Sequence, residues 1–340
     1  GSDTPISSEK RSGHVGDQVT GLAPKAIAGY TPVSDNVQDL KLGADESQNV
    51  VKFYYRQNVS LKANSDSKTY NGSEQGVDGY TTNLPEGVSA SFDGVMLEGG
   101  KGTNAGDYPY TFANGTIGKV SSDNNYVVTQ TTPGNLHIGP VTDEAVVKIA
   151  GKTGTEKYNG KQQTVSGWDV TEAPDGFDQS KVTLAEGATA EAKGKDAGTY
   201  YMGLTAASFV SADGNYAKVK FEVVDGSLEI TKRKVTLWSE DGHKNYDGST
   251  LQRQTNIRVD GTKDVYDNDK DTTIQKTFEG DGFVEGEGVN NKNVKWFDEN
   301  NIAPGCYDNK FECEPRSGTN FDNCEITYEY GKLYVNKRAD

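Results

Sequence analysis

Three acidic residues in one short segment have the spacing of calcium ligands. Asp267, Asp269 and Asp271 alternate as the carboxylates do at positions 1, 3 and 5 of an EF-hand loop. That loop also needs Gly at position 6 and Glu at position 12, where this chain has Thr272 and Phe278. The segment is therefore predicted to be a solvated acidic loop without a cofactor, and calcium binding is the alternative.

The three cysteines lie near the C-terminus, and an odd number leaves at least one thiol unpaired. Cys306 and Cys313 are seven residues apart, so they would face opposite sides of a regular strand. The polar stretch 314–323 between Cys313 and Cys324 suits a hairpin loop. We predict a Cys313–Cys324 disulfide and a free Cys306. Dimerisation through Cys306 and three unpaired thiols are the alternatives.

No catalytic constellation is visible, so the chain is not predicted to be an enzyme. His14, His137 and His243 are far apart and lack the spacing of metal ligands. The sequence Gly151-Lys152-Thr153 matches the end of a phosphate-binding loop, but Val146 stands where the first glycine is needed.

Composition narrows the classes of partner. Of the 340 residues, 50 are Asp or Glu and 35 are Lys or Arg, which gives a net charge of −15. Nucleic acids and anionic membranes attract basic surfaces, so we expect neither as a partner. No apolar run is long enough to cross a membrane. The opening Gly1-Ser2 has the look of a cleavage remnant, and we expect a soluble fragment.

Hydrophobic residues are only 33 % of the chain, and 40 residues are Gly, which favours several small cores over one large core. Short alternating runs such as 59–63, 218–223 and 235–237 put apolar groups on one face, as half-buried strands do. We predict an all-β chain without large helices, formed as an elongated array of small β modules. Each module is an Ig-like sandwich or a β-grasp-like fold.

Internal repeats organise the chain. The triplets Tyr70-Asn71-Gly72, Tyr158-Asn159-Gly160 and Tyr246-Asp247-Gly248 are spaced 88 residues apart, and each follows an opening strand. Asn-Gly and Asp-Gly tolerate the positive φ of tight turns. Later marks recur in the same order: Asn104-Ala105-Gly106, Asp196-Ala197-Gly198 and Ala303-Pro304-Gly305, and then Asn125-Tyr126, Asn215-Tyr216 and Asn320-Phe321.

These marks predict β repeats at 58–143, 144–232 and 233–340, preceded by a separate module at 1–57. The third repeat is longer, with an insertion near 253–277 that we expect on a surface loop where binding could differ. The ending 336–340 is similar to the junction at 231–233, so we expect further repeats of the parent chain to follow.

Most tyrosines at the repeat marks are predicted to be core. Trp238 differs, because Val235 and Leu237 occupy the inward positions of its strand and Trp238 would then point outward. An outward indole packs on a neighbouring module or anchors a partner. We predict Trp238, Tyr266, Trp296 and Phe297 as candidate binding residues.

Two resemblances follow from these residues. Residues 13–55, with Gly29-Tyr30-Thr31-Pro32-Val33 and Asn49–Tyr55, resemble a truncated or divergent MucBP mucin-binding module. The three repeats resemble MBG-type and bacterial Ig-like repeats of large Gram-positive surface proteins. The resemblance implies an extracellular, wall-attached parent protein.

The resemblance also implies adhesion to a host macromolecule, which is our leading expectation for function. Mucin glycoprotein and immunoglobulin are the partners it implies. Superantigen-like binding of immunoglobulin variable domains is one alternative, and a passive stalk or spacer is the other. The negative charge gives no long-range attraction to sialylated or sulfated mucins, which favours a protein partner.

Overall fold

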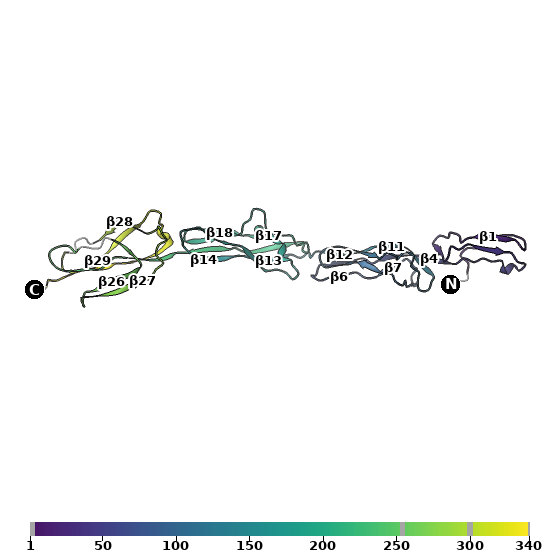
Figure 1. Cartoon of the computed structure of the whole chain (residues 1–340), viewed down its shortest axis with the longest axis horizontal. Helices are drawn as coiled ribbons and strands as arrows, with labels where there is room; N and C mark the ends of the chain where they lie inside the picture. The colour runs from purple at the N-terminus through teal and green to yellow at the C-terminus, as the bar shows by residue number, and fades with distance from the viewer. Residues whose placement is uncertain (1–3, 252–255, 298–301, 339–340) are drawn as a thin grey trace. The chain divides into compact units, whose positions relative to one another are not determined.

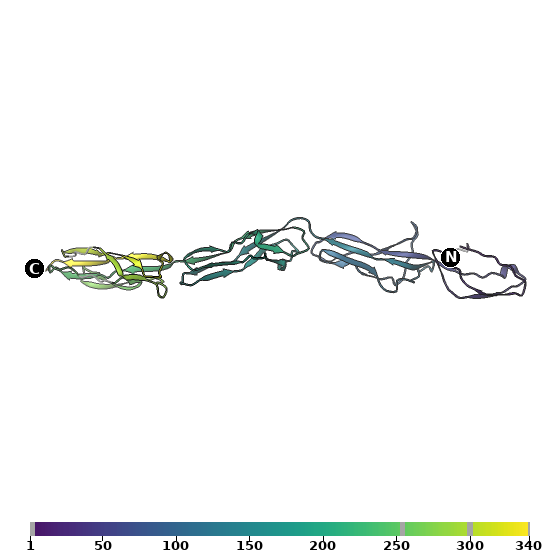
Figure 2. The same cartoon turned by 90° about the horizontal axis from the view of Figure 1, so that it is seen from above.

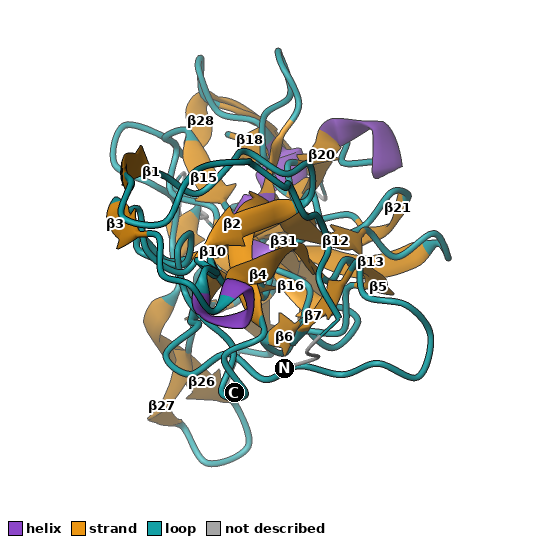
Figure 3. Cartoon of the chain, turned by 90° about the vertical axis from the view of Figure 1, so that its right-hand side faces the viewer, coloured by secondary structure: helices purple, strands orange, loops and turns teal. Residues whose placement is uncertain are grey.

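The computed structural model describes residues 4–251, 256–297 and 302–338 (Figure 1). The prediction of an all-β chain is confirmed: the described residues form strands and four short 3₁₀ segments (Figure 3). Within these residues no helix is long and apolar enough to cross a membrane. The chain divides into two compact units. The first contains 1–145, 174–178 and 212–219, and the second contains 146–173, 179–211 and 220–340.

The N-terminal segment of the first unit carries little sheet of its own. Strand β1 (Gln18–Leu22) pairs antiparallel with β3 (Gln38–Lys41), and β2 (Tyr30–Pro32) pairs antiparallel with the first strand of the following repeat, β4 (Tyr55–Ala63). No residue of β1, β2 or β3 is fully buried. This segment therefore depends on the adjoining repeat for part of its pairing.

The first repeat is organised by two parallel pairs. Strand β4 pairs in parallel with β11 (Tyr126–Thr132), and β5 (Asp66–Thr69) pairs in parallel with the last strand, β12 (Gly134–Gly139). Antiparallel partners complete the sheets: β7 (Tyr80–Thr82) on β4, β10 (Gly106–Phe112) on β12, β8 (Leu97–Gly99) on β10, and β6 (Gln75–Gly76) on β9 (Lys101–Gly102).

The second repeat also pairs an early strand in parallel with its last strand. Strand β14 (Thr153–Lys157) pairs in parallel with the last strand, β22 (Ser227–Thr231), which also pairs with β19 (Gly198–Tyr201). The remaining strands are β13 (Ala145–Gly151) between β16 (Trp168–Glu172) and β21 (Val219–Val224), β15 (Gln163–Ser166) with β18 (Glu191–Gly194), and β17 (Val182–Leu184) with β20 (Phe209–Ser211).

In the third repeat the opening and closing strands pair in parallel along their length. Strand β23 (Arg233–Trp238) lies beside β31 (Cys324–Glu329), and β24 (Gly242–Asn245) lies beside β32 (Gly331–Asn336). Both pairings have one register, since every residue faces the one 91 positions later. In Figure 2 these green and yellow strands run side by side.

The other strands of the third repeat flank this pair. Strand β25 (Arg258–Val259) pairs with β23, β29 (Gly305–Asn309) with β32, and β28 (Val289–Trp296) with β30 (Phe311–Pro315). The insertion forms an antiparallel hairpin of β26 (Gly261–Asp267) and β27 (Thr272–Phe278), where the sequence predicted a loop. Residues 253–255 of the predicted insertion lie outside the described residues.

Alternation along the opening strands builds the cores. Val59, Leu61 and Ala63 are fully buried on β4, and Val235 and Leu237 are buried on β23. The predicted turns also form, because Gly72, Gly160 and Gly248 all have φ between 75° and 82°. The module boundaries at 58, 144 and 233 stay predictions.

Candidate functional site

The prediction that Trp238 points outward is wrong. Its side chain is buried, with 7 % exposed, and its indole Nε1 donates a hydrogen bond to the carbonyl of Asp260 at 2.8 Å. The ring lies 6.0 Å from that of Phe278. Asp260 directly precedes the inserted hairpin and Phe278 is its last residue. The insertion therefore covers Trp238.

The other predicted binding aromatics do not form one surface. Tyr266 is buried, stacks on His243 at 3.8 Å between ring centroids, and donates its hydroxyl to Asp271 at 2.5 Å. Trp296 is half-buried against the ring of Phe311 at 5.7 Å. Phe297 is half-buried, and the ammonium groups of Lys295 and Lys310 lie over its ring. Their binding role stays a prediction.

Two of the three aspartates in the hairpin, Asp267 and Asp271, use their carboxylates to stabilise the turn. Asp267 accepts hydrogen bonds from the backbone N–H of Asp269 and Lys270, and it pairs with the ammonium of Lys270 at 2.9 Å. Asp271 has a φ of 50° and accepts the Tyr266 hydroxyl. Among the described residues no three acidic, His or Cys side chains are grouped to hold a metal ion.

The predicted Cys313–Cys324 disulfide is wrong, because all three cysteines are free. Cys313 lies on β30 opposite Val294, whereas Cys324 begins β31 opposite Arg233. The residues between them contain a 3₁₀ turn, Phe321–Asn323, and do not close a tight hairpin. Both thiols contribute instead to the apolar core of the third repeat.

These environments predict a clear order of thiol reactivity. Cys306 is exposed, whereas burial raises the pKa of Cys313 to about 11 and also raises the pKa of Cys324. The thiolate is the reactive form. At pH 8 we expect one equivalent of a thiol reagent to react rapidly and two more only after unfolding. Rapid reaction of a Cys306→Ser chain would contradict this placement.

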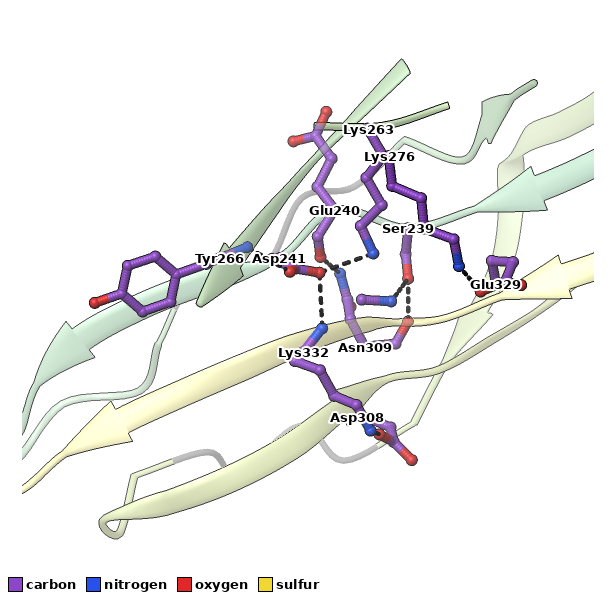
Figure 4. Close-up of polar contacts among 11 residues, drawn as sticks. Ser239, Glu240, Asp241, Lys263, Tyr266, Lys276, Asp308, Asn309, Glu329 and Lys332 are labelled. Carbon is purple, nitrogen blue, oxygen red and sulfur yellow. Dashed lines mark hydrogen bonds and ion pairs between the residues drawn. The ribbon is translucent and has the colours of Figure 1, made fainter. Parts of the chain in front are cut away.

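A buried ion pair attaches the inserted hairpin to the main sheets of the third repeat (Figure 4). The ammonium of Lys263, on β26, lies 2.8 Å from Asp241, and both side chains are about 5–6 % exposed. Asp241 also accepts the backbone N–H of Tyr266 at 2.9 Å and of Lys332 at 3.0 Å. The carboxylate therefore bridges the hairpin and the closing strand.

Asp241 lies in the gap between β23 and β24, close to the point where Tyr330 separates β31 from β32. The shared register places Ser239 opposite Tyr330 and Asp241 opposite Lys332. At this interruption the Ser239 hydroxyl donates to the carbonyl of Asn309 at 2.5 Å and accepts the N–H of Gly331 at 2.9 Å. The side chain of Asn309 is fully buried and donates to the carbonyl of Glu240 (Figure 4). These polar groups replace the ladder hydrogen bonds that the break removes.

Sequence reasoning missed Asp241, Lys263 and Asn309. The usable signal is weak: the run Ser239-Glu240-Asp241-Gly242 interrupts an alternating strand pattern. No property of Lys263 in the sequence distinguishes it from the other lysines of the polar hairpin.

A second cluster joins the first repeat to loops of the second repeat, inside the first compact unit. The Tyr70 hydroxyl donates to the carbonyl of Gly176 at 2.7 Å, and the Tyr70 ring packs edge-on against Tyr216. Asn215 accepts the N–H of Ala105 at 2.7 Å and donates to Asn104 at 3.2 Å. Tyr70, the tyrosine of the first triplet, therefore belongs to the core of the first repeat and also contacts the second repeat.

The same cluster recurs inside the second unit, between the second and third repeats. The Tyr158 hydroxyl donates to Glu287 at 2.5 Å. Asn323 accepts the N–H of Ala197 at 2.7 Å and donates to Asp196 at 2.9 Å. The sequence marks aligned Asn320 with Asn215, but Asn320 caps the 3₁₀ turn, and Asn323 makes the contact.

Charged groups reinforce this second cluster. Lys157 pairs with Asp281, and the guanidinium of Arg233 donates to the carbonyl of Tyr158 at 3.3 Å and to the carbonyl of Gly282 at 2.7 Å. Desolvation, followed by the hydrogen bond to Glu287, raises the pKa of Tyr158 from 10.0 to about 12.

This shift predicts that the contact weakens in strong alkali. The unfolded chain loses the Tyr158 proton near pH 10, while the folded chain keeps it until about pH 12. The stabilisation is therefore complete below pH 10 and is lost as the pH rises toward 12. We expect the free energy of unfolding of wild type minus that of Tyr158→Phe to fall across this range. A constant difference would contradict the assignment.

Comparisons with known proteins do not identify a family for this chain. No family model and no curated protein matches the chain. The chain is similar to the I9–I11 tandem from titin, with 11 % sequence identity and a TM-score of 0.15, over 82 % of this chain and all of that one. The predicted MucBP and MBG resemblances thus have no matching family model.

Proposed function

We propose that this chain is a non-enzymatic stalk segment of an extracellular, wall-attached protein, and that its repeats resist tension. The observation that carries the proposal is the parallel pairing of the opening and closing strands. A pull on the start of β23 and the end of β32 drags these neighbours in opposite directions along their shared axis. All hydrogen bonds between them are then loaded together.

The pattern recurs in each repeat. In the first repeat β5 and β12 pair in parallel, and in the second repeat β14 and β22 do so. The polar clusters at Asn215 and Asn323 connect successive repeats through hydrogen bonds and not through a bare linker. The burial of Trp238 and Tyr266 removes two of the aromatics that favoured a binding role, which supports the stalk over the adhesin.

Single-molecule pulling tests the proposal. When the whole chain is stretched by its two ends, we expect each repeat to resist and then unfold in one abrupt step, because forced unfolding reports the unfolding barrier. Gradual extension without discrete steps would contradict a tension-resisting role.

We propose host binding through the inserted hairpin as the second candidate. Residues 271–277 are all exposed, including the apolar side chain of Ile274 with 57 % exposed. In the described residues β27 pairs only with β26, so its other edge is open to a strand of a partner. An immunoglobulin, including its variable domains, or a mucin glycoprotein is the partner we test.

Biolayer interferometry against mucin and against Fab and Fc fragments decides this candidate. Binding that is lost when the exposed residues Thr273, Ile274 and Gln275 of β27 are replaced by Gly would support it. Lys263 and Tyr266 stay in that variant, so the contacts of Asp241 with the hairpin are kept. If the chain binds none of the three proteins, or if the replacement leaves binding unchanged, the hairpin is rejected as the binding site.

A further inference from the structure

The two inter-repeat clusters use one two-residue site to hold an asparagine. Residue 104 or 196 supplies a side-chain oxygen, and the next residue, Ala105 or Ala197, supplies a backbone N–H. The carboxamide of Asn215 or Asn323 fits between them, with its oxygen accepting and its nitrogen donating. Only 8 % of Asn215 and 1 % of Asn323 are exposed, so both asparagines are sealed from water.

This chemistry is selective for a carboxamide. Aspartate would place a carboxylate against the oxygen of Asn104 or Asp196, and leucine would leave the buried N–H without an acceptor. A buried donor or acceptor that loses its partner costs about 1–3 kcal/mol.

The third repeat keeps the backbone frame of this site. The hydroxyls of Tyr108, Tyr200 and Tyr307 donate to the carbonyls of Asn104, Asp196 and Ala303 at 2.8, 3.0 and 2.9 Å. The N–H of each triplet tyrosine also bonds to the end of the closing strand: Tyr70 to Gly139, Tyr158 to Thr231 and Tyr246 to Asn336. Ala303 and Pro304 therefore occupy the positions of the asparagine-binding pair.

Both polar groups of the site are missing there. Ala303 has no side-chain acceptor, and Pro304 has no backbone N–H to donate.

We propose that the pairs Asn104-Ala105 and Asp196-Ala197 are docking sites for the asparagine of a following repeat, and that the third repeat has lost this site. A repeat joined after residue 337 would therefore lack the asparagine contact. The proposal does not depend on the stalk function, since docking is measured without any load.

The first test places the third repeat's Ala-Pro pair at positions 196 and 197 of the second repeat. Spin labels on unnatural residues replacing Lys181 and Ser317, both exposed, report the distance between the second and third repeats. We expect a narrow distribution in the unmodified chain and a broad one in Asp196→Ala/Ala197→Pro and in Asn323→Ala. Asp322→Ala, an exposed neighbour, is the matched control.

Two checks keep this test decisive if the proline variant folds poorly. Asn323→Ala leaves the second repeat intact and must broaden the distribution by itself. Adding Asp196→Ala to Asn323→Ala must broaden the distribution little further, because both substitutions remove the same contact. A distribution that stays as narrow as in the unmodified chain in Asn323→Ala would overturn the proposal.

The second test restores the site. The full chain is extended from Lys337 into a second copy of residues 233–338. One spin label is placed in the third repeat and one in the added repeat, so that they report the distance between these two repeats. We expect a broad distribution in this chain and a narrow one after Ala303→Asp and Pro304→Ala. A narrow distribution without these substitutions, or a broad one with them, would overturn the proposal.

Discussion

Replacing Lys263 with Met is expected to lower the free energy of unfolding of the third repeat by about 3–5 kcal/mol, because it leaves a buried carboxylate without its cation. Asp241 is as buried as Lys263, and water cannot take the place of the ammonium without opening the hairpin. The measurement is chemical denaturation of the whole chain, following the transition that reports the third repeat.

The matched control is Lys270→Met in the same hairpin. Lys270 pairs with Asp267 at 2.9 Å, but its side chain is 76 % exposed, so we expect a loss of about 0–1 kcal/mol. The double variant Asp241→Leu/Lys263→Met should be less destabilised than Lys263→Met alone, since no charge stays buried. Equal losses for Lys263→Met and Lys270→Met would contradict the role of the buried pair.

Phe311→Ala is expected to cost a similar amount, about 3–5 kcal/mol, because it removes the centre of the third repeat's core. Phe311 is 1 % exposed, and its ring lies within 6 Å of the rings of Trp296, Tyr328 and Tyr330. Trp296 lies on β28, Tyr328 lies on β31, and Tyr330 lies between β31 and β32. Because the three rings are held by different segments, they cannot all move inward to fill the cavity. Thermal and denaturant unfolding measure the loss.

Ile274→Ala is the control, since an apolar side chain that is 57 % exposed makes little difference to stability, within about 0.5 kcal/mol. If Phe311→Ala unfolds no more easily than this control, the core of the third repeat is assigned to the wrong residues.

The fold class and the cores were predictable because both rest on periodicity. Alternation placed Val235 and Leu237 inward, and the recurring triplets marked turns whose glycines do have positive φ. These features are local in sequence, so a single chain carries them. Several repeat marks also lie at the contacts between repeats, but the sequence predicted only a core role for their tyrosines.

The errors at Trp238 and Lys263 have one physical origin, the inserted hairpin. Alternation alone placed Trp238 outward, but Asp260 and Phe278 cover it from a segment some 20–40 residues later in the chain. Lys263 and Asp241 meet for the same reason. Contacts of this kind are set by how a hairpin folds back on a sheet, and neither spacing nor residue type reveals them.

The geometry of pulling on the third repeat tests the central claim most directly. Attachment at residues 232 and 337 loads the parallel strands β23–β24 and β31–β32 in shear, because the force acts at opposite ends of the pair. Attachment at 232 and 317 pulls on the same end of both strands and separates their hydrogen bonds one after another. At equal loading rate we expect a several-fold higher unfolding force in the first geometry. Equal forces in the two geometries would contradict the account.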